Sequence, residues 1–190
     1  MSPWEIIGTV LGVIGVALMI RQHVWTWPVG LVQVSVSGWV FYQAKLYSDA
    51  LLQIFFFGIQ VYGWCHWLHA RERAKPELPV TRLPMPRRLG WIAAGIVGTF
   101  AWGELMRRNT DAALPYWDAF ILVFSLIAQW FQARKYLENW AGWMIVNGVA
   151  IGVFWVKELR LYSVLYVIFF VMAMFGHRAW QRSLRQHAHP

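Results

Sequence analysis

Seven apolar segments follow one another along this chain, and each is near the ~17–25 residues that an α-helix needs to cross ~30 Å of hydrocarbon. We expect transmembrane helices over residues 4–20, 27–43, 49–69, 89–106, 115–133, 139–156 and 161–180. Only 14% of the 190 residues are charged, well below the roughly 25% of soluble domains. Because one soluble core of this size cannot cover so much apolar surface, we predict an all-α integral membrane protein.

The basic residues lie between the apolar segments and favour one side of the membrane. If the segment 70–88 faces the cytoplasm, twelve Lys and Arg residues fall on the cytoplasmic side and five on the other. The positive-inside rule then predicts an external amino terminus and a cytoplasmic carboxyl terminus. Topology accounts for the net charge of +8, so we expect a lipid bilayer and no nucleic acid as the partner.

An internal repeat sets the arrangement of these helices. When the chain is shifted against itself by 113 positions without gaps, residues 4–67 fall on residues 117–180. The shift pairs identical residues of kinds that seldom match by chance: Trp4 with Trp117, Arg21 with Arg134, Trp27 with Trp140, Gly63 with Gly176, and Trp67 with Trp180. Each repeat holds three helices, so one further helix between them gives both repeats the same orientation in the membrane.

We therefore predict two parallel three-helix repeats joined by a linker helix. The first repeat covers residues 1–69, a basic cytoplasmic loop covers 70–88, the linker helix covers 89–113, and the second repeat with a cytoplasmic tail covers 114–190. Carriers built from parallel repeats bind their substrate near the midplane between the two halves. This arrangement favours a small-molecule transporter.

Polar residues that lack a polar counterpart in the other repeat are the candidates for substrate recognition. Asn147 lies in the middle of the sixth segment, and its counterpart is Val34. Trp143 and Trp140 precede Asn147 by four and seven residues, which places them on the same helical face. Stacking on tryptophan together with hydrogen bonds to an amide suits a flat heterocyclic ligand. The alternative role of Trp140 is that of an anchor at the membrane interface.

A second candidate face lies on the third segment. Gln53 and Gln60 are seven residues apart, and Trp64 continues the same face. Amides inside a membrane are costly without partners, so they face protein or a water-filled cavity. The alternative to ligand recognition is that these amides form hydrogen bonds between helices.

Other groups of chemically active residues are sparse. The spacings of His66 with His69 and of His187 with His189 suit a metal, but no carboxylate or thiol cluster accompanies them, so we expect no metal and no cofactor. Glu5 and its counterpart Asp118 lie near the outer ends of equivalent segments, where acids commonly complement the helix dipole and could also bind a proton or cation. The chain contains no phosphate-binding loop, nucleophile elbow or zinc-protease motif, so we expect no enzyme.

Five motifs of the chain form a recognisable set: Trp25-Thr-Trp-Pro-Val-Gly30, Phe41-Tyr-Gln-Ala-Lys-Leu-Tyr47, Asp49-Ala-Leu-Leu-Gln53, Tyr62-Gly-Trp64, and Glu138-Asn-Trp-Ala-Gly-Trp143 followed by Asn147. This set resembles the PnuC family of bacterial vitamin transporters. The resemblance implies a three-plus-one-plus-three helix fold related to the SWEET sugar transporters, a homotrimer, and a place in the bacterial inner membrane. It also implies uptake by facilitated diffusion, with phosphorylation by a cytoplasmic kinase trapping the vitamin.

The resemblance implies a site lined by Trp140, Trp143, Asn147, Gln53 and Gln60, and leaves the choice among nicotinamide riboside, thiamine and riboflavin open. An asparagine can pair with a carboxamide through both a donor and an acceptor, which favours nicotinamide riboside. Thiamine is the second choice, since tryptophan faces hold either ring cation. A different class of function, a non-transporting membrane assembly subunit, predicts that no cavity exists at the midplane.

Overall fold

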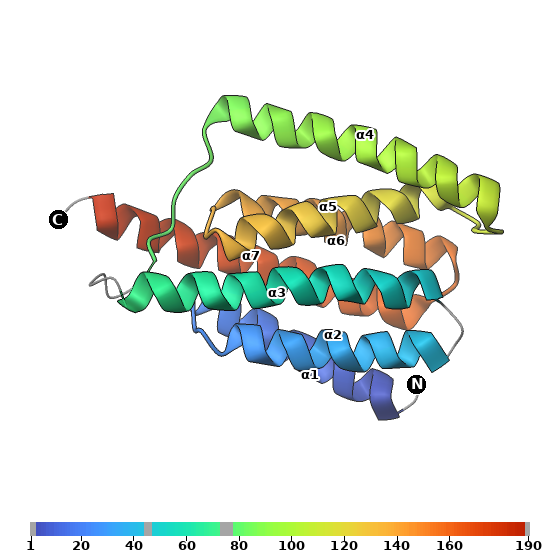
Figure 1. Ribbon diagram of the computed structural model, residues 1–190, viewed down its shortest axis with the longest axis horizontal. Coiled ribbons are helices and arrows are strands. Elements are labelled where there is room, and N and C mark those ends of the chain that lie inside the picture. Colours follow the sequence, from blue (N-terminus) through green and yellow to red (C-terminus); the bar gives the residue numbers. More distant parts are fainter. Residues whose placement is uncertain (1–2, 44–46, 73–77, 189–190) are drawn as a thin grey trace.

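The computed structural model describes residues 3–43, 47–72 and 78–188, and these are helical almost throughout (Figure 1). The predicted fold class, a seven-helix all-α protein, is confirmed. The helices are α1 (Pro3–Ile20), α2 (Thr26–Gln43), α3 (Tyr47–Glu72), α4 (Met85–Asn109), α5 (Pro115–Ala133), α6 (Glu138–Val156) and α7 (Arg160–Ala188).

Three helices extend beyond the spans that hydropathy predicts. Helix α3 continues to Glu72, α4 already begins at Met85, and α7 continues to Ala188, eight residues past its predicted end. Hydropathy marks the part of a helix that matches the bilayer, whereas the helix itself continues into water for as long as its backbone hydrogen bonds do. The connection between α3 and α4 is therefore shorter than the predicted loop over 70–88.

Within each repeat the helices pack in chain order. Helix α2 lies between α1 and α3, and α6 lies between α5 and α7 (Figure 1). The two groups meet along two equivalent interfaces, α3 against α5 and α7 against α1. Helix α4 lies on the outside and packs against α5, and an ion pair between Arg88 and Glu138 joins its first turn to α6. These contacts are those expected of two three-helix units with a peripheral linker.

Close packing of a tryptophan ring on a helix backbone recurs at the same offset of 113 residues. In the first repeat the indole of Trp27 occupies the space that a Cβ on Gly63 would fill, and in the second the indole of Trp140 does the same at Gly176. Each of these rings also meets a second tryptophan of its own repeat edge-on, with centroids 5.3 and 5.5 Å apart. Glycine is required at both positions because the ring lies directly against the helix backbone.

The turns after α1 and α5 are equally similar. Gln22 and Lys135, which are 113 residues apart, adopt left-handed φ values of 55° and 52°. The Gln22 N–H donates to the Met19 carbonyl, as the Lys135 N–H does to the Gln132 carbonyl. Left-handed residues of this kind end many helices by satisfying their last carbonyl groups. The repeat therefore extends to backbone hydrogen bonding.

The outer surface is apolar. Side chains such as Ile54, Val97 and Val156 are 65%, 67% and 68% exposed, an arrangement suited to contact with lipid. By length and composition alone, three helices of the described chain qualify as membrane spans: Met85–Asn109, Glu138–Val156 and the Arg160–Gln186 part of α7. The glutamines that α2, α3 and α5 carry lower the mean hydropathy of those helices.

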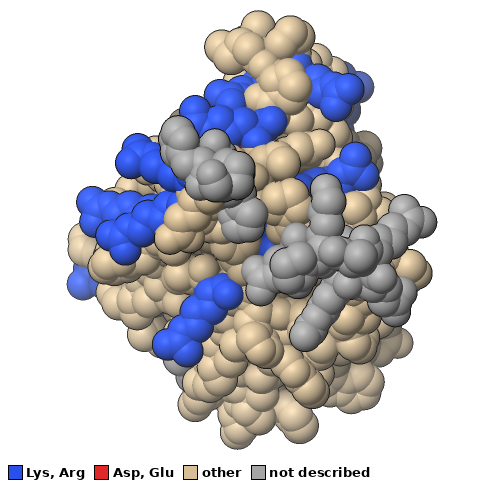
Figure 2. Space-filling view, turned by 90° about the vertical axis from the view of Figure 1, so that its left-hand side faces the viewer, with Lys and Arg blue, Asp and Glu red and all other residues tan. Residues whose placement is uncertain are grey.

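The two ends of the molecule differ in charge. Figure 2 shows Lys and Arg gathered on the end that contains the carboxyl terminus, with no Asp or Glu visible among the described residues there. At the opposite end, cations of the described chain are paired with acids: Lys157 with Asp118 at 2.7 Å, and Arg107 and Arg108 both with Glu104 at 2.7 Å. At the carboxyl-terminal end one described arginine, Arg88, is paired with an acid, Glu138. We call this Arg-rich end the basic face.

Candidate functional site

A cavity of about 300 Å³ lies between the two repeats. Its volume is at the lower end of the roughly 300–1,000 Å³ of small-molecule sites. Every helix except α4 contributes to its wall, through Leu11, Gly12, Gly15, Val16, Met19, Thr26, Gly30, Gln33, Val34, Gln53, Phe56, Gln60, Ser125, Gln129, Gln132, Trp140, Trp143, Asn147, Tyr166, Phe169 and Ala173. Sixteen of these form eight pairs at the offset of 113, so the cavity is centred between equivalent surfaces.

Five of the six predicted site residues line this cavity: Asn147, Trp143, Trp140, Gln53 and Gln60. The sixth, Trp64, is partly buried and packs against the tryptophan cluster at the end of the cavity nearer the basic face. It shares the helical face of Gln53 and Gln60. That face lines the cavity at the two glutamines, but at Trp64 it packs against the other repeat. The structure therefore does not bring Trp64 into the cavity wall.

Three amides in the cavity wall are buried but have no protein partner among the described residues. Gln60, Gln129 and Asn147 are 8%, 7% and 4% exposed. No hydrogen bond links their side chains to any part of the chain that the structure describes. Amides that hold helices together would be bonded to one another or to a backbone carbonyl. These three instead present free donors and acceptors to the cavity, which favours recognition over the helix-bonding alternative.

Amides are concentrated at one of the two interfaces between the repeats. Three residues of α5 supply polar groups where their counterparts on α1 supply none: Ser125, Gln129 and Gln132 correspond to Gly12, Val16 and Met19. On α3 and α7, Gln53 and Gln60 correspond to Tyr166 and Ala173, so a phenol and a methyl group replace two amides. Because α3 packs against α5 and α1 against α7, one interface between the repeats forms an amide-rich wall and the other a mostly apolar wall.

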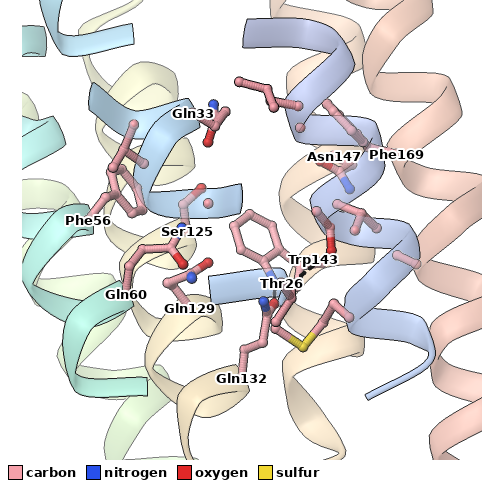
Figure 3. A pocket seen from close by; sticks show the side chains of 18 of the residues that line it. Thr26, Gln33, Phe56, Gln60, Ser125, Gln129, Gln132, Trp143, Asn147 and Phe169 are labelled. Atoms are coloured by element: carbon pink, nitrogen blue, oxygen red, sulfur yellow. Dashed lines mark hydrogen bonds between the residues drawn. The ribbon is translucent and has the colours of Figure 1, made fainter. Parts of the chain in front are cut away.

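The close view of the cavity adds one amide to the opposite side. Figure 3 shows Gln60, Gln129 and Ser125 together on one side, and Asn147 and Phe169 on the other. The two sides of the cavity therefore offer a ligand different hydrogen-bonding groups.

Trp143 is held in place by a cavity residue that the internal comparison had not singled out. Its indole N–H donates to the Gln132 side-chain oxygen at 2.7 Å. This bond fixes the plane of the ring, which leaves its face available for stacking. Trp140, by contrast, is 1% exposed and is inserted against Gly176, just as its counterpart Trp27 is against Gly63. Its matched packing favours a structural role.

The two repeats fill one equivalent position in opposite ways. In the first repeat the side chain of Gln60 lies against the backbone of Gly30, where any Cβ would overlap the amide. In the second repeat the corresponding residues are Ala173 and Trp143, so the small residue and the large one are exchanged between the helices. This exchange makes the cavity asymmetric while the helix packing stays symmetric.

Sequence reasoning missed Ser125, Gln129 and Gln132. The same internal comparison that identified Asn147 was available for them, because each pairs with a residue that has no polar side chain. Hydropathy assigns their segment as a membrane span and does not indicate that these three side chains face a cavity.

Asp118, the acidic residue considered for proton or cation binding, forms an ion pair with Lys157. Both of its carboxylate oxygens accept hydrogen bonds from the Lys157 ammonium at 2.7 Å, which ties α5 to the end of α6. Glu5 and the tail histidines His187 and His189 lie outside the side chains that the structure describes. Within the described residues, no group of three or more His, Cys, Asp or Glu side chains could hold a metal.

Comparisons with known proteins agree with one family over nearly the whole chain. The family model described as "Nicotinamide mononucleotide transporter" matches residues 2–182. The nicotinamide riboside transporter PnuC of Escherichia coli is 30% identical over 96% of this chain and 86% of its own length. The riboflavin/roseoflavin transporter RibM of Streptomyces davaonensis is 29% identical over 98% of this chain and 88% of its own.

A solved structure gives the same answer. The crystal structure of the vitamin B3 transporter PnuC matches with a TM-score of 0.76 and 25% identity, over 95% of this chain and 81% of that one. Together with the seven helices and the central cavity, these similarities identify a membrane transporter and not an enzyme. The chain belongs to the PnuC family of transporters, the family whose model is described as nicotinamide mononucleotide transporter.

Proposed function

We propose that this transporter takes up nicotinamide riboside across the bacterial inner membrane by facilitated diffusion. The observation that carries the proposal is the set of three buried amides, Gln60, Gln129 and Asn147, that have no protein partner among the described residues. Buried polar groups are costly unless bonded, so such a set is suited to a ligand that supplies several hydrogen-bonding groups at once.

The proposed orientation follows from the two walls. The ring of the vitamin stacks on Trp143, whose face attracts a ring cation. Its carboxamide pairs with Asn147 through a donor and an acceptor. The ribose hydroxyl groups then face Gln60 and Gln129 on the amide-rich wall. Gln53 also lines the cavity and completes the proposed site, and Trp140 forms part of its wall in a structural role.

The absence of ionisable groups from the cavity supports uniport. Among the described residues that line it, none is Asp, Glu, His, Lys or Arg. Transport coupled to protons or sodium ions generally uses such groups at membrane depth. We infer that uptake follows the gradient of the vitamin and that a cytoplasmic kinase maintains this gradient by phosphorylating the product.

Riboflavin is the second candidate, because one relative is named as a riboflavin transporter and the identities of the two relatives differ little. Thiamine, whose ring is also a cation, is the third. Calorimetry of the purified protein with each of the three vitamins separates them. We expect nicotinamide riboside to bind most tightly. Tighter binding of riboflavin or thiamine would assign that vitamin as the substrate instead. If none of the three vitamins binds, the result would favour a non-transporting assembly subunit.

The orientation and assembly are also proposals. The concentration of arginine on the basic face supports a cytoplasmic carboxyl terminus and an external amino terminus. The units 1–69 and 114–190 are proposed as the two repeats, with 70–88 as a cytoplasmic loop and 89–113 as the linker. A homotrimer is expected from the family resemblance, and native mass spectrometry in detergent measures it.

A further inference from the structure

The cavity is closed toward the basic face by a cluster of tryptophans contributed by both repeats. Trp67 and Trp180, which are counterparts, lie with their ring centroids 6.4 Å apart. The Trp67 indole N–H donates to the Ala133 carbonyl at 3.0 Å, and the Trp180 indole N–H donates to the Met19 carbonyl at 3.1 Å. Each bond crosses from one repeat to the other. Since Met19 also lines the cavity, this cluster forms the boundary of the cavity on that side.

A lysine is buried beside this cluster. Lys135 is 2% exposed, its ammonium donates to the Gln22 side-chain oxygen at 2.9 Å, and it lies 4.3 Å from the centroid of the Trp67 ring. Burying an ammonium group is costly, and an apolar residue of the same size would fill the space with less penalty. A buried lysine at this position therefore suggests that its contacts with Gln22 and Trp67 have a function beyond stabilising the fold.

One partner of Lys135 is its own counterpart in the other repeat. Gln22 and Lys135 have the same backbone conformation and follow equivalent helices, so their side chains approach each other across the boundary between the repeats. On both helices the cavity-lining residue lies three positions earlier, Met19 before Gln22 and Gln132 before Lys135. The contact is thus about one helical turn from the cavity, between it and the basic face.

Four side-chain hydrogen bonds join the two repeats at this end of the described molecule. Besides the three already given, the Arg134 guanidinium donates to the Tyr62 hydroxyl at 2.7 Å. At the opposite end, none of the ion pairs of the described residues joins the two repeats. Lys157 and Asp118 both belong to the second repeat, and Glu104 and its two arginine partners all belong to α4. The four hydrogen bonds hold the two repeats together at the basic face, and we call them the lock. Carriers with repeats alternate access by moving one half against the other, so this lock has to open for substrate to leave.

We propose that Lys135 is a gate residue: its contact with Gln22 over Trp67 keeps the cavity closed toward the basic face, and it breaks each time the cavity opens on that side. The proposal rests on membership of a transporter family and is independent of which vitamin is carried. The competing explanation is that Lys135 only complements the carboxyl end of α5, as cations at helix ends commonly do.

Exchanging the two side chains distinguishes these explanations. The test uses proteoliposomes that contain a Cys65→Ser, Ala173→Cys background, in which the exposed native thiol is removed and one thiol lines the cavity. A membrane-impermeant thiol reagent added on either side reports which face the cavity opens to. The variants are Lys135→Gln, Gln22→Lys, and the double exchange.

The gate predicts opposite changes on the two faces. Lys135→Gln removes the charged donor and Gln22→Lys opposes two ammonium groups, so each should raise labelling from the basic face on the order of tenfold and lower labelling from the other face. The double exchange should return both rates close to their starting values, because the two positions are equivalent. A fold that is only loosened would instead be labelled faster from both faces.

Three outcomes overturn the proposal: unchanged labelling in both single variants, faster labelling from both faces, or no recovery in the double exchange. If Lys135→Gln does not fold, Gln22→Lys decides alone. A gate predicts faster labelling from the basic face, whereas a simple helix-end effect predicts unchanged labelling, since the new lysine would complement α1 in the same way.

Discussion

The side chain of Gln60 lies against the backbone of Gly30, in the space where a Cβ would stand, and it lines the cavity. In the second repeat the corresponding residues are Ala173 and Trp143, so there the large side chain belongs to the other helix of the pair. Asymmetry in the cavity thus arises from exchanging side-chain size between symmetric positions, without altering how the helices pack.

Replacing Gly30 by Ala should displace the Gln60 amide, because the new Cβ would overlap it. The far end of a glutamine can move, so we expect the fold to survive. Losing one well-placed hydrogen bond to the ligand costs about 0.5–1.5 kcal/mol, roughly a two- to tenfold loss of affinity. Calorimetry measures it. Gly58→Ala on α3, where no atom lies within 4 Å of the added Cβ, is the control. Equal affinity in both variants would contradict the role given to Gln60.

Replacing Gly63 or Gly176 by Ala should destabilise the protein. At both positions the new Cβ would overlap a tryptophan ring, which is rigid and buried. Overpacking of this kind costs about 1–3 kcal/mol, and the two variants should lose similar amounts because their surroundings are equivalent. Unfolding in detergent measures this. Gly152→Ala, with open space around its Cβ, should show no loss. Destabilisation in only one of the two variants would contradict the structural equivalence of the repeats.

Replacing Trp143 by Ala should weaken binding by removing a stacking and cation–π surface worth on the order of 1–2 kcal/mol. Trp117, which is 53% exposed on the outer surface, provides a control of the same size. Calorimetry on both variants should show a loss of affinity for Trp143→Ala alone. A comparable loss in Trp117→Ala would mean that tryptophan removal acts through the fold and not through the cavity.

A reporter fused to the carboxyl terminus tests the orientation. Helix α7 ends on the basic face, where the arginines should lie in the cytoplasm. We expect a reporter that is active only in the cytoplasm to work at this position, and one that requires the periplasm to be inactive. The reverse result would place the basic face outside.

The arrangement of the helices could be predicted from the sequence because the chain contains an internal repeat. Trp27 matches Trp140 and Gly63 matches Gly176 because each tryptophan ring packs on the helix backbone at the glycine, a contact that neither partner can leave by changing alone. Comparing the repeats also identified Asn147, Gln53 and Gln60 as residues of the cavity wall.

Other features depend on three-dimensional relations that the repeat does not encode. Trp64 shares the helical face of Gln60, yet it lies beyond the cavity. Periodicity predicts which face of a helix a residue lies on, but it does not predict how far along that face the cavity extends. The contact of Lys135 with Gln22 joins two residues at the turns after equivalent helices, and no local pattern signals that these turns meet. Helix ends outside the bilayer were missed because hydropathy does not report them.

The central claim is that the cavity between the repeats binds the vitamin through Asn147, and Asn147→Leu tests it most directly. Leucine keeps the approximate size of the side chain but leaves the polar group of the ligand unpaired, at a cost of roughly 1–3 kcal/mol. Val34→Asn, at the equivalent position of the first repeat, is the control and should give little gain, because the residue one turn before it is Gly30 and not a tryptophan.

Calorimetry with nicotinamide riboside and thermal unfolding should be measured on the same preparations of wild type and Asn147→Leu. We predict that affinity falls roughly 5- to 100-fold while the unfolding temperature is nearly unchanged. Unchanged affinity together with a lower unfolding temperature would contradict the account, since it would make Asn147 a contact between helices and place the binding site elsewhere.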